Sequence, residues 1–458
     1  MIHNVQSTSS AVQPRRLSYV GKGFLTATAL VIGTGMSGPA VAGNTVNADG
    51  APRVAASTGL VERVSWTDDD TEPRSKSTIG AATQVSSAGG RYVVFSTEAP
   101  LVPRDTNDLD DVYLRDMAAG RTRLVSIGSD GSLGDNFSSE PSISADGRYV
   151  AFTTWASTLV PNDSDGESLD VVVKDMTTSE LAVVSRVPGS DVSRLNSFRP
   201  VISGDGRYVA FQSYERFSRL DDDRREDVYR HDLATGRSTL VSVGRGGGNL
   251  RQSVLVGGIS HNGQHITFGH DNSAWVRDVK QQGSVRFWHE PDDEQIPSGT
   301  VGRPAISGNG NFVAFSTRNR FVVDGDSGQN VDVYRLNLDN GRFHSVSVGR
   351  GGDDANHDSF APTLSYSGRF VGFLSYASNL VSGDENRYHD AFRRDMRTGS
   401  TVLVSRGLDG PANERSGRSN TVSVSPDGQQ VVFDSYATNL GPSDANGAQD
   451  VYQWRARP

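Results

Sequence analysis

Acidic loops recur along the chain, and their carboxylates are the side chains with the clearest capacity for chemistry. Each loop has an Asp, an Asp or Asn two residues later, and a further Asp four to six residues beyond that. Hard cations such as Ca²⁺ bind several oxygen ligands on a flexible loop, and each of these loops supplies three. The candidate metal ligands are Asp105, Asn107 and Asp111; Asp163, Asp165 and Asp170; Asp221, Asp223 and Asp227; Asp324, Asp326 and Asp332; Asp384, Asn386 and Asp390; and Asp444, Asn446 and Asp450.

The spacing of these ligands departs from the EF-hand pattern, which needs a glycine at position 6 and a bidentate Glu at position 12. Asp and Asn side chains also cap turns, because they accept hydrogen bonds from nearby backbone N–H groups. We favour turn capping and keep calcium as the alternative. Repetition does not separate the two, since a repeated turn repeats its caps. No other cofactor is expected.

Histidines gather in one part of the chain, at His261, His265, His270 and His289. An enzyme would use His265 or His270 as a ligand or base, but on one strand His261 and His265 lie on one face and His270 on the other. No G-x-S-x-G, P-loop or dinucleotide motif is present. The chain has no cysteine, which excludes thiolate sites and disulfides. We therefore nominate no catalytic residue and interpret the histidines as turn and surface residues.

The strands that carry the acidic loops belong to a repeat. A Gly-containing turn followed by V-x-F or a close variant occurs seven times, ending at Phe95, Phe152, Phe211, Phe268, Phe315, Phe373 and Phe433, at spacings of 57, 59, 57, 47, 58 and 60 residues. The second unit shows the four strands expected in each: 141–144, 149–152, 171–174 and 181–185. Asp-Gly and similar turns separate them. Four antiparallel strands repeated seven times predict an all-β, seven-bladed β-propeller.

The first and last predicted strands of the propeller together account for one complete blade. The seventh unit stops at 450–454, after its third strand, and residues 60–66 have the pattern of the missing fourth strand. We expect this N-terminal strand to complete the last blade, which would leave no unpaired edge. The propeller would then span 59–458.

The N-terminal segment has the features of an export signal. Arg15, Arg16 and Lys22 precede a mostly apolar stretch at 23–35 and an A-V-A cleavage site at 40–42. We expect 1–42 to be a signal peptide, 43–58 a flexible linker, and the mature chain to have no membrane span. The protein would then be extracellular or in the cell envelope (the periplasm if the source has one). The net charge of −9 argues against nucleic acid as a partner.

The phrases SADGRYVAF (144–152) and SGDGRYVAF (203–211) resemble the WD-like propeller repeats of TolB-type proteins. The D-V-Y-x-R-D continuation is similar to repeats of exported bacterial propellers of unassigned role. The resemblance covers about residues 60–457 and implies the fold rather than the function, because propellers host binding modules and enzymes alike. We expect no counterpart of the α/β N-terminal domain of TolB in this sequence, so the membrane-complex role of TolB is not carried over.

One face of the predicted propeller should carry the functional loops. In a four-stranded blade (strands a to d) the b–c and d–a connections emerge together, and here they are acidic or long. Loops on a rigid scaffold commonly bind partners. We expect a monomeric binding or scaffold module for a protein or an envelope glycan. The alternative is a carbohydrate-active lyase or hydrolase with its site at the channel mouth.

Repeated arginines are expected to form ion pairs between blades rather than a site. They precede the tyrosine of strand b at Arg91, Arg148 and Arg207, and they occur in R-D phrases at Arg115, Arg277 and Arg394.

Overall fold

The computed structural model describes residues 59–67, 79–85, 89–160, 168–187, 195–251, 253–289, 302–318, 322–323, 329–407, 410–414, 416, 422–441, 444 and 446–457. The expected signal peptide at 1–42 and linker at 43–58 lie outside these residues. The described part of the chain consists of strands, turns and loops. Within it, no helix is long and apolar enough to cross a membrane.

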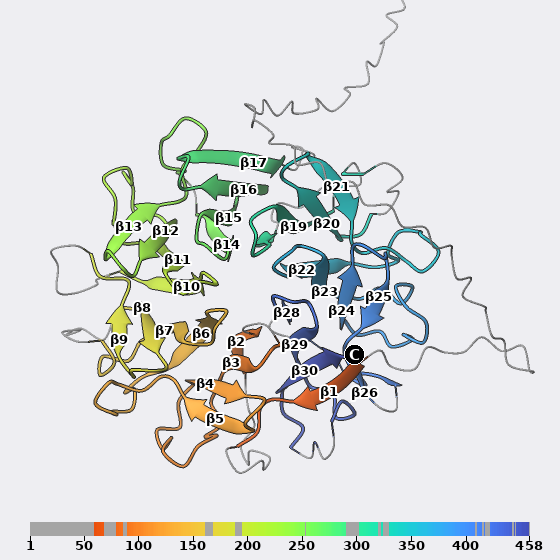
Figure 1. Cartoon of the computed structure of the whole chain (residues 1–458), viewed down its shortest axis with the longest axis horizontal. Helices are drawn as coiled ribbons and strands as arrows, with labels where there is room; N and C mark the ends of the chain where they lie inside the picture. The colour runs from red at the N-terminus through yellow and green to blue at the C-terminus, as the bar shows by residue number, and fades with distance from the viewer. Residues whose placement is uncertain are drawn as a thin grey trace, which may run out of the picture. The chain divides into compact units, whose positions relative to one another are not determined.

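Seven four-stranded antiparallel sheets surround a common axis as blades, which confirms the predicted propeller (Figure 1). Blade one comprises β2 (Ile79–Val85), β3 (Tyr92–Thr97), β4 (Asp111–Asp116) and β5 (Arg121–Leu124); blade two β6 (Ser138–Ile143), β7 (Tyr149–Thr154), β8 (Asp170–Asp175) and β9 (Leu181–Val183); blade three β10 (Ser197–Ile202), β11 (Tyr208–Ser213), β12 (Asp227–Asp232) and β13 (Arg237–Leu240); and blade four β14 (Leu255–Ile259), β15 (His265–His270), β16 (Ser273–Asp278) and β17 (Gly283–His289).

Blade five comprises β18 (Ala305–Ile306), β19 (Phe312–Thr317), β20 (Asp332–Asn337) and β21 (Arg342–Ser345); blade six β22 (Ser359–Leu364), β23 (Phe370–Ser375), β24 (Asp390–Asp395) and β25 (Thr401–Leu403); and blade seven β28 (Val422–Val424), β29 (Gln430–Ser435), β30 (Asp450–Ala456) and β1 (Gly59–Arg63). A small hairpin, β26 (Arg406–Gly407) and β27 (Gly410–Pro411), follows blade six. The first strand of each blade is the innermost, and the innermost strands of neighbouring blades contact one another.

The two ends of the described chain meet in blade seven. Strand β1 lies antiparallel to β30, with Gly59 opposite Ala456 and Arg63 opposite Tyr452. Beside this pair, a guanidinium nitrogen of Arg63 lies 2.6 Å from a carboxylate oxygen of the buried Asp450. In the structure, blade seven therefore combines strands from both ends of the described residues.

The V-x-F phrase supplies the core because alternate residues of a strand point to the same side. Phe95 lies opposite Tyr113 on the next strand, and both rings are fully buried. All seven closing phenylalanines of the repeat are fully buried: Phe95, Phe152, Phe211, Phe268, Phe315, Phe373 and Phe433.

Neighbouring blades pack through the turn between their first two strands. Gly147 has a φ of +76°, and a Cβ at this position would lie 2.2 Å from the ring of Tyr92 in the preceding blade. Only glycine satisfies both conditions. The same contact recurs around the ring as far as Gly90 of blade one, whose Cβ would lie 2.7 Å from Gln430 of blade seven. The packing thus runs through all seven blades.

The arginines before the strand-b tyrosines pair within a blade, so the expected ion pairs between blades are wrong for them. Arg91 pairs with Asp116 at 2.7 Å, and Arg148 and Arg207 pair with Asp175 and Asp232 in the same way. Arg277 and Arg394 donate to side chains on the outermost strand of their own blades. Arg115 donates to Thr122 on the outermost strand of its own blade and to the carbonyl oxygen of Thr67, in the connection after β1 of blade seven. Other arginines donate to turn carbonyls of the next blade: Arg230 to Gly263, Arg335 to Gly368 and Arg393 to Gly428.

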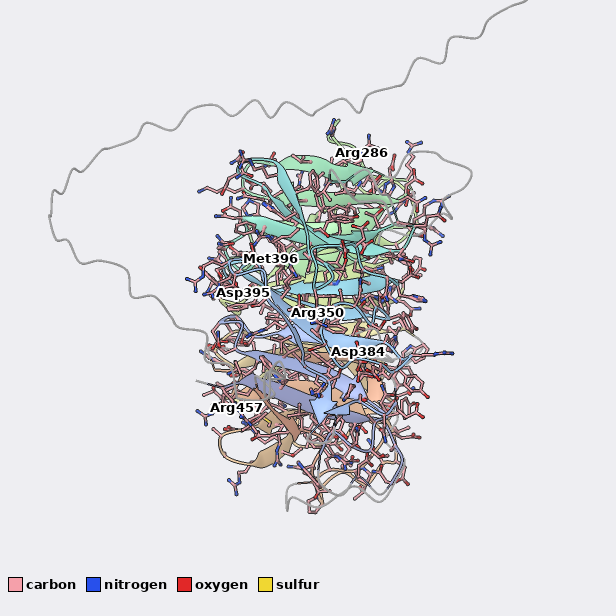
Figure 2. All side chains as sticks on the ribbon, turned by 90° about the vertical axis from the view of Figure 1, so that its right-hand side faces the viewer. Arg286, Arg350, Asp384, Asp395, Met396 and Arg457 are labelled. Carbon is pink, nitrogen blue, oxygen red and sulfur yellow. The ribbon has the colours of Figure 1, made fainter. Side chains whose placement is uncertain are left out.

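The two faces of the propeller differ in their connections. Figure 2 views the propeller edge-on: Asp384, in the b–c connection of blade six, lies towards one face, and Asp395 at the end of β24 lies towards the other. We call the face with the b–c and d–a connections the loop-rich face. The opposite face carries the tight a–b and c–d turns.

Candidate functional site

The last aspartate of each acidic loop has a structural role. Asp111 is buried at the start of β4, and its carboxylate accepts a 2.5 Å hydrogen bond from Ser126 Oγ. The same Oγ accepts a hydrogen bond from the N–H of Val112. This arrangement, the Asp–Ser clasp, ties the third strand of a blade to the end of the fourth. It recurs at 2.5–2.6 Å in Asp170–Ser185, Asp227–Ser242, Asp332–Ser347, Asp390–Ser405 and Asp450–Ser65.

The first aspartate of the loop accepts a hydrogen bond from a core tyrosine in several blades. Tyr113 donates to Asp105, and Tyr229 donates to Asp221 at 2.5 Å. In blade six Phe392 replaces the tyrosine, and Asp384 is buried. Burial raises the pKa of Asp384 to about 6, although Arg406 acts in the opposite direction.

The middle residue of the loop caps a turn. Its side-chain oxygen accepts from the N–H two residues later in Asn107–Leu109, Asp223–Arg225, Asn386–Tyr388 and Asn446–Ala448. Asp163 and Asp165, and likewise Asp324 and Asp326, lie outside the described residues. Most of the oxygen atoms proposed as metal ligands in the described loops thus make hydrogen bonds within the protein.

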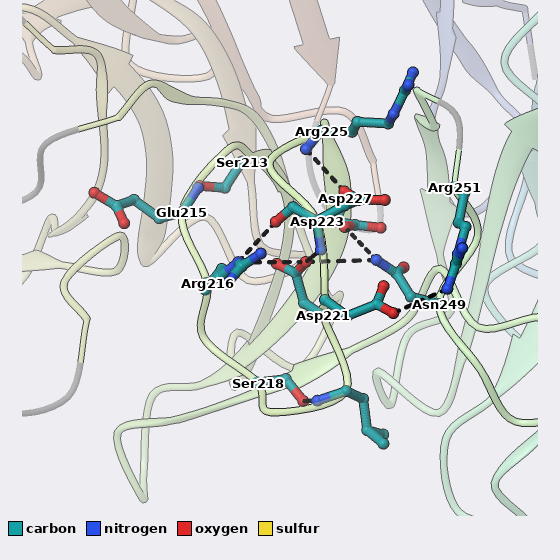
Figure 3. Close-up of polar contacts among 12 residues, drawn as sticks. Ser213, Glu215, Arg216, Ser218, Asp221, Asp223, Arg225, Asp227, Asn249 and Arg251 are labelled. Atoms are coloured by element: carbon teal, nitrogen blue, oxygen red, sulfur yellow. Dashed lines mark hydrogen bonds and ion pairs between the residues drawn. The ribbon is translucent and has the colours of Figure 1, made fainter.

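The loop of blade three brings three carboxylates together. One oxygen each from Asp221, Asp223 and Asp227 lies within 4.8 Å of the others (Figure 3). The amide of Asn249 donates to Asp227 at 3.1 Å and to Asp221 at 3.4 Å, and Arg216 Nε lies 4.0 Å from Asp221. Asp223 Oδ2 is buried without a hydrogen-bond partner in the described structure.

Burial raises the pKa of Asp227 to about 6; Ser242 and Asn249 oppose the shift, and Asp221 and Asp223 add to it. A divalent cation would relieve this repulsion, because its positive charge favours the ionised carboxylates.

Aromatic pairs stand at the inner rim of the loop-rich face. In each pair, a residue at the end of strand b packs against one near the start of the innermost strand. The pairs are Trp155–Phe137, Tyr214–Phe198 and Tyr376–Phe360, with ring centroids 4.7, 6.2 and 5.9 Å apart. Sequence reasoning missed them, although an aromatic residue directly after T-T, Q-S or L-S at the end of strand b marks each one.

Charged residues also lie at the axis, directly before the proline of the innermost strand. They are Glu140, Arg199 and Arg303, and Ala361 holds the same position in blade six. Glu140, Arg199 and Ala361 have φ values of 53°, 55° and 52°. A left-handed backbone costs a non-glycine residue about 1–2 kcal/mol, so the surrounding strands must hold it in place. Sequence reasoning missed this position, although the phrase x-P-x-[IL]-S marks it.

The described histidine side chains of blade four, His261, His265 and His270, have separate surroundings. The backbone N–H of His261 donates to Gly308 of the next blade from the a–b turn. His265 Nε2 lies 3.5 Å from Asp278. His270 is half-buried at the other end of β15, and its pKa is lowered by burial.

No protein-family model and no curated protein sequence matches the chain. Solved structures match over most of its length. An oligogalacturonate lyase in complex with manganese is 14% identical, with a TM-score of 0.52 over 88% of this chain and 99% of that one. An oligogalacturonate lyase from Vibrio parahaemolyticus is 13% identical, with a TM-score of 0.50 over 87% and 97%. TolB from Acinetobacter baumannii is 16% identical, with a TM-score of 0.39 over 80% of each chain. At these identities the likeness to the lyases shows the propeller fold alone.

Proposed function

We propose that this protein is an exported β-propeller that binds a protein or an envelope glycan on its loop-rich face. The aromatic pairs at the inner rim carry the proposal. Three different blades present such a pair, and Tyr376 is 40% exposed. Aromatic side chains supply large contact areas to partners, and a rigid scaffold holds them in place before binding.

The alternative is a carbohydrate-active lyase or hydrolase. Its support is the fold shared with the oligogalacturonate lyases, and many unrelated activities share one fold. The last aspartate of each loop, a candidate acid or base for a hydrolase, instead supports strand pairing through a clasp. This favours binding over catalysis.

Paired tyrosine variants test the binding proposal. Tyr376 lies on the loop-rich face and is 40% exposed; Tyr366, in an a–b turn on the opposite face, is 46% exposed. Immobilised protein would be challenged with envelope proteins and glycans. We expect Tyr376→Ala to lose the captured ligand and Tyr366→Ala to retain it. Equal retention by both variants would contradict the assignment of the face, and steady turnover of a captured glycan would favour the lyase or hydrolase.

We also propose that Asp221, Asp223 and Asp227 bind one Ca²⁺. Three carboxylates within 4.8 Å of one another offer the hard oxygen ligands that Ca²⁺ prefers. The buried Oδ2 of Asp223 has no hydrogen-bond partner in the described structure, so it is available to the ion. The ion would hold the b–c loop of blade three on the loop-rich face.

A further inference from the structure

The axis carries a fixed carboxylate beside an arginine. Glu140 Oε2 accepts hydrogen bonds from the backbone N–H of Arg199 at 2.9 Å and from Thr153 Oγ1 at 3.1 Å. Its other oxygen lies 3.4 Å from Arg199 Nε. Glu140 therefore holds the Nε side of the guanidinium, and no hydrogen bond from the terminal nitrogens of Arg199 to a described residue is formed.

A second arginine at the axis has no partner in the described part of the chain. Arg303 is exposed, and it makes no hydrogen bond or ion pair with any residue that the structure describes. Although part of the side chain reaches solvent, its pKa is lowered to about 10, first because surrounding protein atoms disfavour the charged form and then because of the positive charge of Arg199. Glu140 acts in the opposite direction. The three side chains thus form one electrostatic group with a net positive charge.

Blade four fixes the segment that carries Arg303. A Cβ on Gly257 of β14 would lie 2.1 Å from the carbonyl oxygen of Pro304, so glycine allows the two backbones to touch. Thr267 Oγ1 donates a 2.5 Å hydrogen bond to the same carbonyl oxygen. The segment that carries Arg303 is therefore fixed against blade four, while its side chain remains exposed.

We propose that Arg199 and Arg303 together bind a carboxylate or phosphate group of a ligand that enters along the axis. Guanidinium groups bind such oxyanions through two parallel N–H···O bonds. Glu140 neutralises only one of the two arginines. The Arg199 guanidinium also lies 5.6 Å from the Phe198 ring, which pairs with Tyr214. An anionic group at the axis would thus adjoin an aromatic wall. The inference deepens the proposed function and depends on it.

Calorimetry at low ionic strength tests this site with three probes: trigalacturonate, which carries carboxylates; maltotriose, a neutral trimer; and inorganic phosphate. We expect trigalacturonate or phosphate to bind and maltotriose not to bind. Arg303→Gln should weaken the affinity for the anion by at least about tenfold, because a charge-assisted hydrogen-bonding group is lost. The matched control is Arg251→Gln, an exposed arginine paired with Asp222 on the loop-rich face.

Glu140→Gln separates charge from structural support. If Glu140 competes with the ligand for Arg199, this variant binds the anion more tightly. If it served only to hold Arg199 in place, binding would weaken, and that result would overturn the competition between Glu140 and ligand. Competition between phosphate and trigalacturonate would indicate a general oxyanion site, whereas trigalacturonate binding without competition would assign the site to carboxylates.

Two results would overturn the site itself: failure of both anions to bind wild-type protein, or equal anion binding by wild type and Arg303→Gln. Neither result touches the proposed function, because the capture experiment with Tyr376→Ala uses envelope extracts and different residues. Conversely, suppose that wild-type protein captures nothing from envelope extracts and still binds trigalacturonate tightly. That outcome would support the anion site and contradict the proposal that the loop-rich face binds an envelope ligand.

Discussion

Ser65→Ala tests whether the N-terminal strand completes the last blade. Ser65 Oγ donates to Asp450 at 2.6 Å and accepts from the N–H of Val451 at 3.2 Å, and all these groups are buried. Alanine would leave a buried carboxylate oxygen and a buried N–H with poorer partners. Arg63 still pairs with Asp450, so we expect a loss of about 1–3 kcal/mol in unfolding free energy.

The loss should depend on pH. Burial raises the pKa of Asp450 to about 6, and Ser65 and Arg63 oppose this rise. Because the folded pKa exceeds the unfolded value, the folded state holds its proton more tightly, and the stability associated with Asp450 falls as pH rises from about 4 to about 6. Ser65→Ala removes a group that favours the ionised form. The variant should therefore lose more stability at pH 8 than at pH 5.

Urea unfolding at both pH values measures this effect, with two comparisons. Ser405→Ala removes the same clasp within blade six, and Ser400→Ala changes an exposed serine in the c–d turn. We expect Ser65→Ala and Ser405→Ala to destabilise by similar amounts, and Ser400→Ala to have little effect. If Ser65→Ala matches wild type while Ser405→Ala is destabilised, β1 does not pair with β30 in solution and the reasoning is refuted.

Three further predictions concern blade packing, metal binding and acid stability. Gly147→Val should lower the unfolding free energy by about 2–4 kcal/mol, because the new Cβ would clash with Tyr92 and the backbone has a φ of +76°. The control Gly236→Val has a φ of +66° and no atom within 4 Å of the new Cβ, so it should cost less; equal losses in urea melts would argue against the clash. Millimolar CaCl₂ should raise the melting temperature at pH 7.5 more than at pH 5, because protons compete with the ion for Asp227, whose pKa is about 6. Asp223→Asn should reduce this rise in melting temperature, and an unchanged rise would exclude this loop as the calcium site. Partner arginines lower the pKa values of four aspartates, Asp116, Asp175, Asp232 and Asp395, so the stability that these pairs contribute should be lost as pH falls below about 4. Arg369→Gln should reduce the decrease in melting temperature at acid pH, and an unchanged decrease would show that this exposed pair contributes nothing.

The fold could be predicted because turn glycines and core residues recur in every repeat unit. Phe152 is buried because alternate residues of a strand face the core, and Gly147 is required because the turn has a positive φ. Both requirements are local, so they repeat in the sequence at the period of the blades. The D-V-Y phrase that begins with Asp111 is also visible in the sequence. Its connection to Ser126 is not, because Ser126 and Asp111 meet only through strand pairing.

The candidate site was harder to predict because its residues come from different blades. Glu140 and Arg199 lie in consecutive units and meet only because their innermost strands are neighbours at the axis. The residue before this proline changes from Glu140 to Arg199, Arg303 and Ala361, so a search for one repeated residue does not detect the position. The aspartates had the opposite property: they repeat strongly, and in the structure their repetition reflects hydrogen bonding within the blade.

Hydrogen exchange of the ligand-bound protein tests the binding face most directly. A ligand captured from envelope extracts would be added to the purified chain, and protection would be mapped on peptides from both faces. The account predicts slower exchange in the b–c segments after Trp155, Tyr214 and Tyr376, with unchanged exchange in the a–b turns. Protection confined to the turns around Asp146, Asp205 and Tyr366 would contradict it.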